Sequence, residues 1–183
     1  MAIRRETAVV GAGAVIGLHR MGRGIYLNNG RTHMIRHDNP SGYSFVPPNG
    51  WTMMQASGDQ VTVCRGPFVD GFTPLIAFSD SSDVQAPSLT GSLEEYVAQT
   101  RERLVEDNSV TAIQEFDFST DTGLEGKKLT YQRPHEAGIV RVQAYFFVGS
   151  DGKRVTVTCI ALAKSGPTLD RLFDKVAKTL EVE

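Results

Sequence analysis

Alternating apolar and polar residues recur through residues 41–183 and predict a sheet of short, consecutive strands. Successive side chains of a strand point to opposite faces, so a half-buried strand alternates in this way. Turn residues such as those at 150–152, Ser-Asp-Gly, separate neighbouring strands and favour hairpins. The pattern therefore predicts an antiparallel sheet. Its expected strands are residues 43–46, 52–55, 60–64, 73–78, 110–119, 127–133, 139–148 and 154–163.

Two stretches with helical spacing interrupt the strands. The first begins at a capping box, in which Ser92 and Glu95 each bond the other's backbone amide, and its apolar residues share one helix face. The second begins at Pro167, a residue favoured in the first helical turn. Its apolar positions are Leu169, Leu172, Phe173, Val176 and Leu180. Helices packed on a hairpin-rich antiparallel sheet give an α+β fold.

Residues 41–51, SGYSFVPPNGW, mark where this pattern starts. Tyr43 and Phe45 fall on one strand face, and Pro47 ends the strand because it cannot donate to a β-ladder. Asn49 and Gly50 tolerate the positive φ angles of a turn. Trp51 then follows and is expected to be buried. This stretch is therefore predicted to open the folded domain.

The first forty residues differ in charge from the rest. They carry six Arg against two acidic residues, whereas residues 41–183 carry 13 Lys and Arg against 19 Asp and Glu. In residues 1–23, Arg4 and Arg5 precede an apolar run too short to span a bilayer, which is the layout of an export or transfer signal. Residues 24–40 show no period and are expected to form an extended basic arm. Residues 41–183 are expected to form one domain.

Residues 8–17, AVVGAGAVIG, have a second interpretation as the strand and glycine turn of a dinucleotide-binding unit. Asp38 follows at the distance expected of a ribose-binding acid. The third glycine comes one residue late, however, and glycines 22, 24 and 30 would interrupt the helix that a βαβ unit requires. The signal interpretation is therefore preferred.

The composition excludes several function classes. The chain has 40% apolar and 22% charged residues and a net charge of −2, so its acidic domain has no basic face for nucleic acid. The sequence contains no run of 18 apolar residues, so no membrane-spanning helix is expected. Metalloprotease, nucleophile-elbow, phosphate-loop and Cys-x-x-Cys motifs are also absent. We therefore expect no enzyme and no cofactor.

Candidate metal ligands and thiols are few. His33 and His37 are four residues apart but have no helical context, so they are not expected to hold a metal. Asp80 and Asp83 fall short of a full Ca²⁺ ligand set. No metal site is therefore the preferred interpretation, and Ca²⁺ at these two carboxylates is the alternative. Cys64 and Cys159 both occupy apolar strand-like runs. Two buried thiols are the preferred interpretation, and a disulfide between neighbouring strands is the alternative.

Three stretches resemble the superfamily that includes the PsbP-type extrinsic proteins of photosystem II, the Ran-binding Mog1 protein and the bacterial DcrB/LpqN-type lipoproteins. Residues 42–51 are similar to its opening, a Gly-aromatic strand followed by Pro and Trp. Residues 92–104 are similar to its first helix. Residues 139–180 are similar to its closing hairpin and amphipathic helix. The resemblance implies an α/β/α sandwich over about residues 41–183.

Within this superfamily, an acidic domain behind an Arg-Arg signal is most similar to PsbP-domain proteins of the thylakoid lumen. The resemblance implies a non-catalytic extrinsic subunit or assembly factor that docks on the lumenal side of a photosystem, where PsbP itself helps to retain Ca²⁺. Residues 24–40 would be the docking arm. Its candidate contacts are Arg31, His33, Arg36 and His37. The alternative is a soluble periplasmic or cytosolic binding module, or a chaperone-adaptor, of the DcrB, LpqN or Mog1 type.

Overall fold

The computed structural model describes residues 7–10, 14–17, 36–55, 61–80 and 92–183. Within these residues the main sheet has seven strands in the order β5-β6-β7-β11-β10-β9-β8, and every neighbouring pair is antiparallel. The strands are β5 (Thr52–Gln55), β6 (Val61–Arg65), β7 (Leu75–Asp80), β8 (Thr111–Ser119), β9 (Glu125–His135), β10 (Gly138–Val148) and β11 (Arg154–Leu162). The hairpins expected from the turn residues are confirmed.

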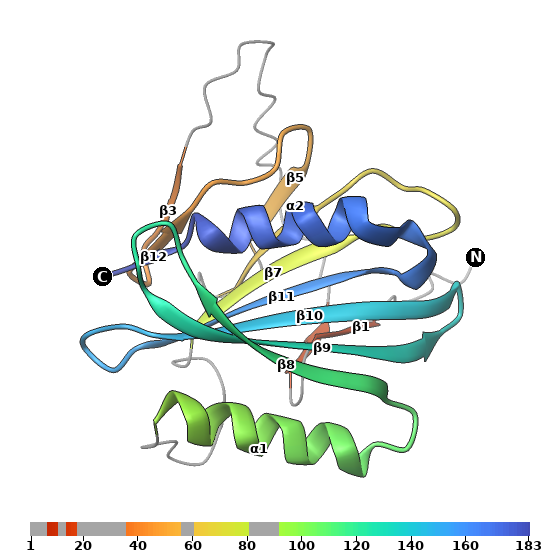
Figure 1. Ribbon diagram of the computed structural model, residues 1–183. Helices are drawn as coiled ribbons and strands as arrows, with labels where there is room; N and C mark the ends of the chain where they lie inside the picture. Colours follow the sequence, from red (N-terminus) through yellow and green to blue (C-terminus); the bar gives the residue numbers. More distant parts are fainter. Residues whose placement is uncertain (1–6, 11–13, 18–35, 56–60, 81–91) are drawn as a thin grey trace.

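The two helices cover opposite faces of this sheet (Figure 1). Helix α1 (Leu93–Glu106) starts at the predicted capping box, where Glu95 N donates to Ser92 Oγ at 3.3 Å and Ser92 N donates to Glu95 Oε2 at 3.0 Å. Helix α2 (Gly166–Lys178) has a proline in its first turn, as expected. A 3₁₀ turn (Ala163–Ser165) connects α2 to β11. The predicted α+β architecture of an antiparallel sheet flanked by helices is confirmed.

Each helix buries its apolar face in a separate core. On the α2 face, Phe173 and Val176 pack with Tyr145 and Phe147 of the sheet. On the α1 face, the buried helix residues Val97 and Leu104 pack with the following sheet residues: Leu129, Tyr131, Val142 and Phe146. Because β10 is covered on both sides, its second half, residues 144–148, is apolar on both faces. In its first half, Arg141 and Gln143 alternate with apolar residues and face Asp170 of α2.

A second, three-stranded sheet has the order β12-β4-β3. Its strands are β3 (His37–Asn39), β4 (Tyr43–Phe45) and β12 (Glu181–Val182). The side chains of Tyr43 and Phe45 are buried, and the Phe45 ring stacks on Phe78 of the main sheet with centroids 3.6 Å apart. These contacts join the small sheet to the α2 side of the main core.

The opening stretch forms the predicted strand and turn, with one difference. Gly50 adopts φ 77°, and the amide of Trp51 donates to the carbonyl of Pro48 at 3.2 Å. Trp51 is only partly buried, because its ring covers the edge of the α2-side core and meets Phe173 edge to face. The prediction of a buried Trp51 is therefore corrected to a partly buried one.

The residues before this stretch add two further findings. Arg36 to Pro40, expected at the end of the arm, belong to the folded part through β3. Strands β1 (Thr7–Val10) and β2 (Ala14–Gly17) form a two-stranded antiparallel sheet. A strand thus occupies the position at which a βαβ unit would begin its helix, which counts against the dinucleotide-binding interpretation. No helix in the described ranges is long and apolar enough to cross a membrane.

Candidate functional site

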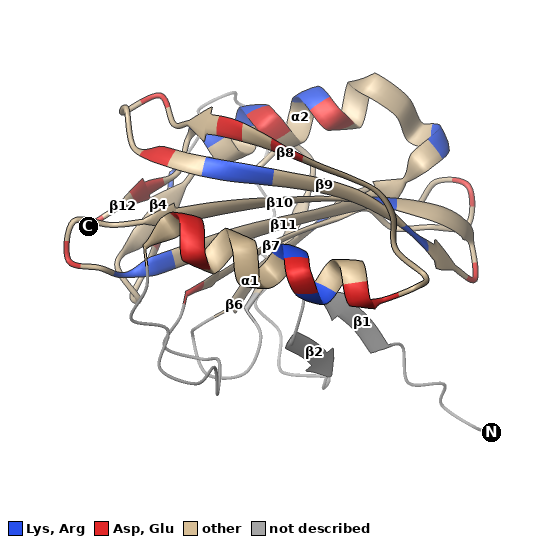
Figure 2. Ribbon diagram, turned by 60° about the horizontal axis from the view of Figure 1, so that its bottom comes forward, with Lys and Arg blue, Asp and Glu red and all other residues tan. Residues whose placement is uncertain are grey.

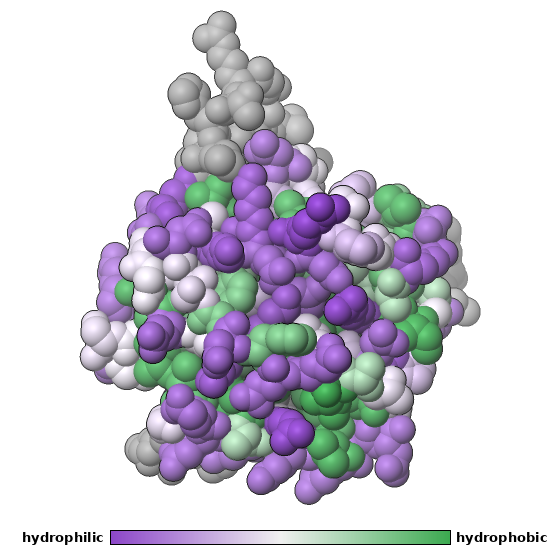
Figure 3. Space-filling view, viewed as in Figure 1, coloured by the Kyte–Doolittle hydropathy of each residue, from purple (hydrophilic) through white to green (hydrophobic). Residues whose placement is uncertain are grey.

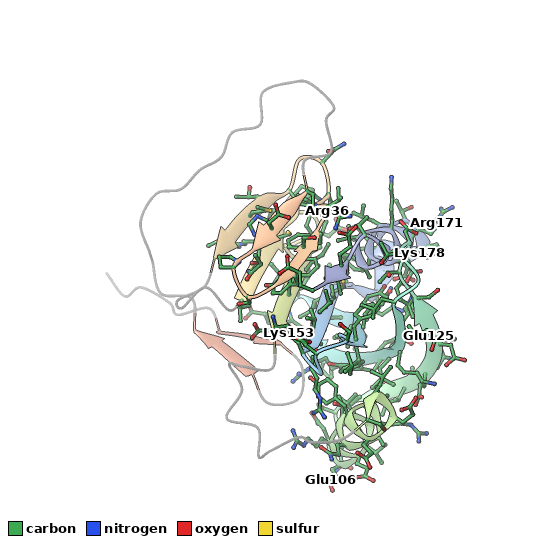
Figure 4. All side chains as sticks on the ribbon, turned by 90° about the vertical axis from the view of Figure 1, so that its left-hand side faces the viewer. Arg36, Glu106, Glu125, Lys153, Arg171 and Lys178 are labelled. Atoms are coloured by element: carbon green, nitrogen blue, oxygen red, sulfur yellow. The ribbon has the colours of Figure 1, made fainter. Side chains whose placement is uncertain are left out.

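Two of the four predicted arm contacts lie in the described structure, and both sit at the start of the small sheet. Arg36 Nη1 donates to Ser44 Oγ and to the carbonyl oxygen of Thr179, each at 3.0 Å, and Arg36 Nη2 lies 2.7 Å from Glu181 Oε1. Thr179 caps the C-terminus of α2, where the helix dipole favours a cation. Figure 4 shows Arg36 and Lys178 on the α2 side of the molecule, far from Glu106 of α1. Arg36 therefore joins α2, β4 and β12.

His37 packs on the core beneath the small sheet. Its ring meets Phe45 edge to face with centroids 5.3 Å apart, and its Nε2 atom is buried without a hydrogen-bond partner in the part of the chain that the structure describes. Burial lowers the pKa of His37, and the negative charge of Asp38 acts in the opposite direction. His37 is thus held as a neutral imidazole. The other two candidates, Arg31 and His33, lie outside the described residues.

A buried polar cluster fastens the small sheet to β6 and β7. Asn39 Nδ2 donates to the hydroxyls of Tyr43 and Thr62, both at 3.0 Å, and Asn39 Oδ1 accepts from the Ser41 amide at 2.8 Å. Burial raises the pKa of Tyr43 to about 12, so this hydroxyl stays protonated. Sequence reasoning missed the cluster. The available signal was the Asn39-Pro40 pair, since Asn side chains commonly bond their own backbone two residues on.

Asp80 is buried beside this cluster, with 3% of its surface exposed. The sequence paired Asp80 with Asp83 as a weak Ca²⁺ candidate, but Asp83 lies outside the described residues. Among the residues that the structure does describe, no group of three or more His, Cys, Asp or Glu side chains could hold a metal ion.

A second polar network crosses from the sheet to α2. Its paired charges are Lys128 with Asp174 at 2.6 Å and Arg141 with Asp170 at 2.8 Å. Tyr145 lies between them: its hydroxyl is 2.7 Å from Gln143 Oε1 and 2.8 Å from Asp174 Oδ1. Burial and the nearby acidic groups raise the pKa of Tyr145. A protonated phenol held by two acceptors cannot act as a base, so this network orients α2.

The cysteines also lack the environment of a reactive site. Cys64 on β6 and Cys159 on β11 both pair with Ile76 of β7, from opposite sides. Strands two positions apart are separated by roughly 9–10 Å, which exceeds the ~7 Å limit for a disulfide. Both thiols are free and buried, and burial raises the pKa of Cys64 to about 12 and that of Cys159 well above its ordinary value. The preferred interpretation of two buried thiols is confirmed.

Large apolar side chains are exposed in the segment between β6 and β7. Phe68 is 73% exposed and Val69 55% exposed. The adjoining turn is held rigidly, since Val69 and Phe72 exchange backbone hydrogen bonds of 2.9 and 3.0 Å around Asp70 and Gly71, which both have positive φ. In the view of Figure 3, apolar surface forms separate areas between polar side chains. Two adjacent exposed apolar side chains are available for contact with another protein surface.

The comparisons with known proteins show the fold. No protein-family model matches the chain, and no curated protein sequence matches it. The solution structure of cyanobacterial PsbP (CyanoP) from Synechocystis sp. PCC 6803 is similar, with 21% identity and a TM-score of 0.58 over 87% of this chain and 98% of that one. The crystal structure of PA94, a protein of unknown function from Pseudomonas aeruginosa, is also similar, with 16% identity and a TM-score of 0.56 over 82% of this chain and 98% of that one. The chain therefore has the PsbP/Mog1-like α+β fold.

Proposed function

We propose that this protein is a non-catalytic binding protein, an extrinsic subunit or assembly factor that docks on the lumenal side of a photosystem. The observation that carries this proposal is the similarity to CyanoP, which extends over 87% of the chain. The partners would be subunits of the membrane complex. The thylakoid lumen would be the site of action.

The chemistry of the polar clusters supports a binding role. The charged side chains of Arg36, Lys128 and Arg141 are engaged in ion pairs that hold α2 and the small sheet in place, and the buried phenols and thiols have raised pKa values. A nucleophile or general base needs a lowered or matched pKa. The exposed Phe68 and Val69 offer instead an apolar surface that a partner could cover.

The test is fractionation of the native protein. The proposal predicts that it sediments with chlorophyll-containing membranes and is released by high salt, as expected of a peripheral protein held in part by charge. Deletion of residues 24–35, the part of the arm before Arg36, should leave the melting temperature nearly unchanged and abolish docking. Substitution of Arg31 and His33 by Ala should weaken docking in the same direction. A protein that stays soluble and monomeric in a non-photosynthetic cell would contradict the proposal.

The second candidate function is a soluble periplasmic or cytosolic binding module or chaperone-adaptor, since the same fold is shared with PA94, described as a protein of unknown function. The fold match to PA94 covers 82% of this chain, nearly as much as the 87% that the match to CyanoP covers. Localisation of a tagged chain in its own cell distinguishes the two functions. Recovery from the periplasm or cytosol, in a complex with a soluble protein, would support the second.

A further inference from the structure

Strand β8 is an outer strand of the main sheet with an unpaired edge. It pairs only with β9, and the pairing is regular from Gln114 opposite Thr130 to Ser119 opposite Glu125. The irregular part is confined to its beginning, where Ala112 has a positive φ of 54°. No strand within the described ranges pairs with its other side. An edge of this kind presents backbone N–H and C=O groups that can pair with another chain.

The side chains of β8 do little to block such pairing. Natural edge strands are commonly protected by charged side chains, above all Lys, by Pro or by bulges. Residues 114–119 contain no Lys or Pro, and the irregular pairing lies before them. Their charged residues, Glu115 and Asp117, are acidic and would oppose an acidic strand but not a basic one.

Phe116 is 47% exposed. Phe118 packs on Tyr145 on the α2 face, so Phe116 lies on that face by alternation, whereas Glu115 and Asp117 lie on the α1 face. Lys127 of β9 pairs with Asp117 at 2.7 Å and offsets one of the two acidic charges. The edge is therefore acidic at Glu115 on one face and aromatic on the other.

A hollow of about 390 Å³ lies between α1 and the acidic face of β8. Seven residues line it: Glu94, Ala98, Arg101, Glu102, Val105, Glu106 and Glu115. Four of these side chains are carboxylates and one is a guanidinium, and the apolar Val105 is 63% exposed. Figure 2 shows acidic segments along α1 and on β8. The hollow thus combines an apolar floor with an excess of negative charge.

We propose that the free edge of β8 and this hollow form a docking groove for an extended segment of a partner protein, in which Lys or Arg alternates with apolar residues. The inference rests on the proposed function, since it names the surface and the chemistry by which this protein would bind. A strand added to a sheet edge gains affinity from main-chain hydrogen bonds and specificity from alternate side chains.

The alternation of side chains along an added strand explains why a segment of alternating basic and apolar residues fits. A strand paired with β8 would lie about 4.8 Å from it and send successive side chains to opposite faces. Basic side chains on the α1 face would meet Glu102, Glu106 and Glu115. Apolar side chains on the α2 face would cover Phe116. Both faces of the edge are therefore complemented by one alternating sequence.

Other occupants fit this surface less well. Nucleic acid and anionic lipid headgroups would be repelled by the carboxylates of the hollow. A partner helix satisfies its own backbone, so it would leave the edge of β8 unpaired. An acidic segment would oppose the existing charge. The free edge and the charge together favour a basic extended segment.

The test uses a fluorescently labelled peptide in which Lys alternates with Val, titrated into the full chain and followed by fluorescence anisotropy. The proposal predicts saturable binding and slowed hydrogen exchange of backbone amides within residues 114–119. Glu115→Lys should weaken binding by about tenfold, because it replaces an attraction by a repulsion at the centre of the groove. Glu136→Lys, an equal charge reversal in the exposed β9–β10 turn, should change binding little.

A second peptide separates edge pairing from charge attraction alone. N-methylation of alternate amides, on the edge that would face β8, removes the donors for pairing and keeps every charge. This peptide should lose binding. Three results would each overturn the groove proposal. The methylated peptide could bind as well as the unmethylated one, or exchange protection could fall elsewhere than on β8. Glu115→Lys and Glu136→Lys could also weaken binding equally.

The outcome is separable from that of the membrane fractionation. If the wild-type chain sediments with photosynthetic membranes but the alternating peptide does not bind, the groove is overturned and the proposed function stands. If the peptide binds along β8 but the chain does not sediment with such membranes, the groove stands and the photosystem role is overturned.

Discussion

Arg36 Nη2 and Glu181 Oε1 lie 2.7 Å apart, although 145 positions (181 − 36) separate the two residues in the sequence. Arg36 directly precedes β3, and Glu181 lies on β12, so this ion pair spans β4, which runs between the two strands. The same guanidinium also reaches the end of α2 through Thr179. The small sheet is thus closed by one side chain that a sequence pattern assigns to a docking arm.

Arg36→Ala is expected to lower the free energy of unfolding by about 1–2 kcal/mol, chiefly through loss of the hydrogen bonds to Ser44 and Thr179. The Glu181 pair should add little, because both side chains are more than a third exposed, at 34% and 45%. Arg36→Lys keeps the charge but not the forked geometry, so its loss should be intermediate. Urea denaturation measures these differences. An unchanged midpoint for Arg36→Ala would show that the residue is free to serve a partner.

The sequence predicted the long elements because their signals are local. The capping box at Ser92, the proline near the start of α2 and the alternation along β10 and β11 each determine structure over a few neighbouring residues. Strands β3 and β12 have only three and two residues and no pattern of their own. They exist because β4 and the side chains of Arg36 and Asn39 hold them, and such contacts between distant segments cannot be inferred from local patterns.

The candidate site depends still more on arrangement. Strand β8 is more polar than the inner strands β10 and β11, but alternation of this kind is found in any strand with one solvated face, so it does not show by itself that β8 ends the sheet. Its outer position follows from the strand order, in which β9 and β10 separate it from β11. The hollow beside Glu115 likewise requires α1 to pack on the same face. Edge strands and grooves therefore emerge only once the topology is known.

Cys64 and Cys159 should remain reduced in the native protein under mild oxidation, because Ile76 lies between their strands. Both thiols should resist alkylation until the chain is unfolded, since burial raises their pKa values and leaves little reactive thiolate. Mass spectrometry after iodoacetamide treatment, with and without denaturant, measures both expectations. Formation of an intramolecular disulfide in the folded protein would contradict the observed register.

His37 should make the protein less stable in mild acid. Burial lowers the pKa of His37 from its ordinary value of 6.5, so below that value the unfolded chain binds more protons than the native one. The contribution of neutral, buried His37 to the free energy of unfolding is fully present above about pH 6.5 and is lost as the pH falls through the lowered pKa. Denaturant unfolding between pH 5 and 8 is the measurement, the range being about that in which histidines titrate.

The variant His37→Gln should reduce this acid-side loss because it removes the titrating ring. His135→Gln is the matched control, since it replaces an exposed imidazole in the β9–β10 turn and leaves Phe45 and β3 untouched. An identical pH dependence in the wild type and in His37→Gln would show that another group is responsible.

Tyr145 and Asp174 should be energetically coupled across the interface between β10 and α2. The Tyr145 hydroxyl has one proton and two acceptors, Gln143 and Asp174, so Tyr145→Phe should cost about 1 kcal/mol. Asp174→Ala should cost more, about 2–3 kcal/mol, because it also leaves Lys128, whose side chain is 14% exposed, without its partner.

A double-mutant cycle over Tyr145→Phe and Asp174→Ala measures the interaction directly, and residues in one network typically couple by about 0.5 kcal/mol or more. Tyr131→Phe is the matched control, because Tyr131 is equally a buried tyrosine of the sheet but packs on the α1 face. Its substitution should show no coupling to Asp174. Strict additivity of the Tyr145 and Asp174 variants would mean that α2 is oriented by its apolar contacts alone, with Phe173 and Val176 sufficient to fix it on the sheet.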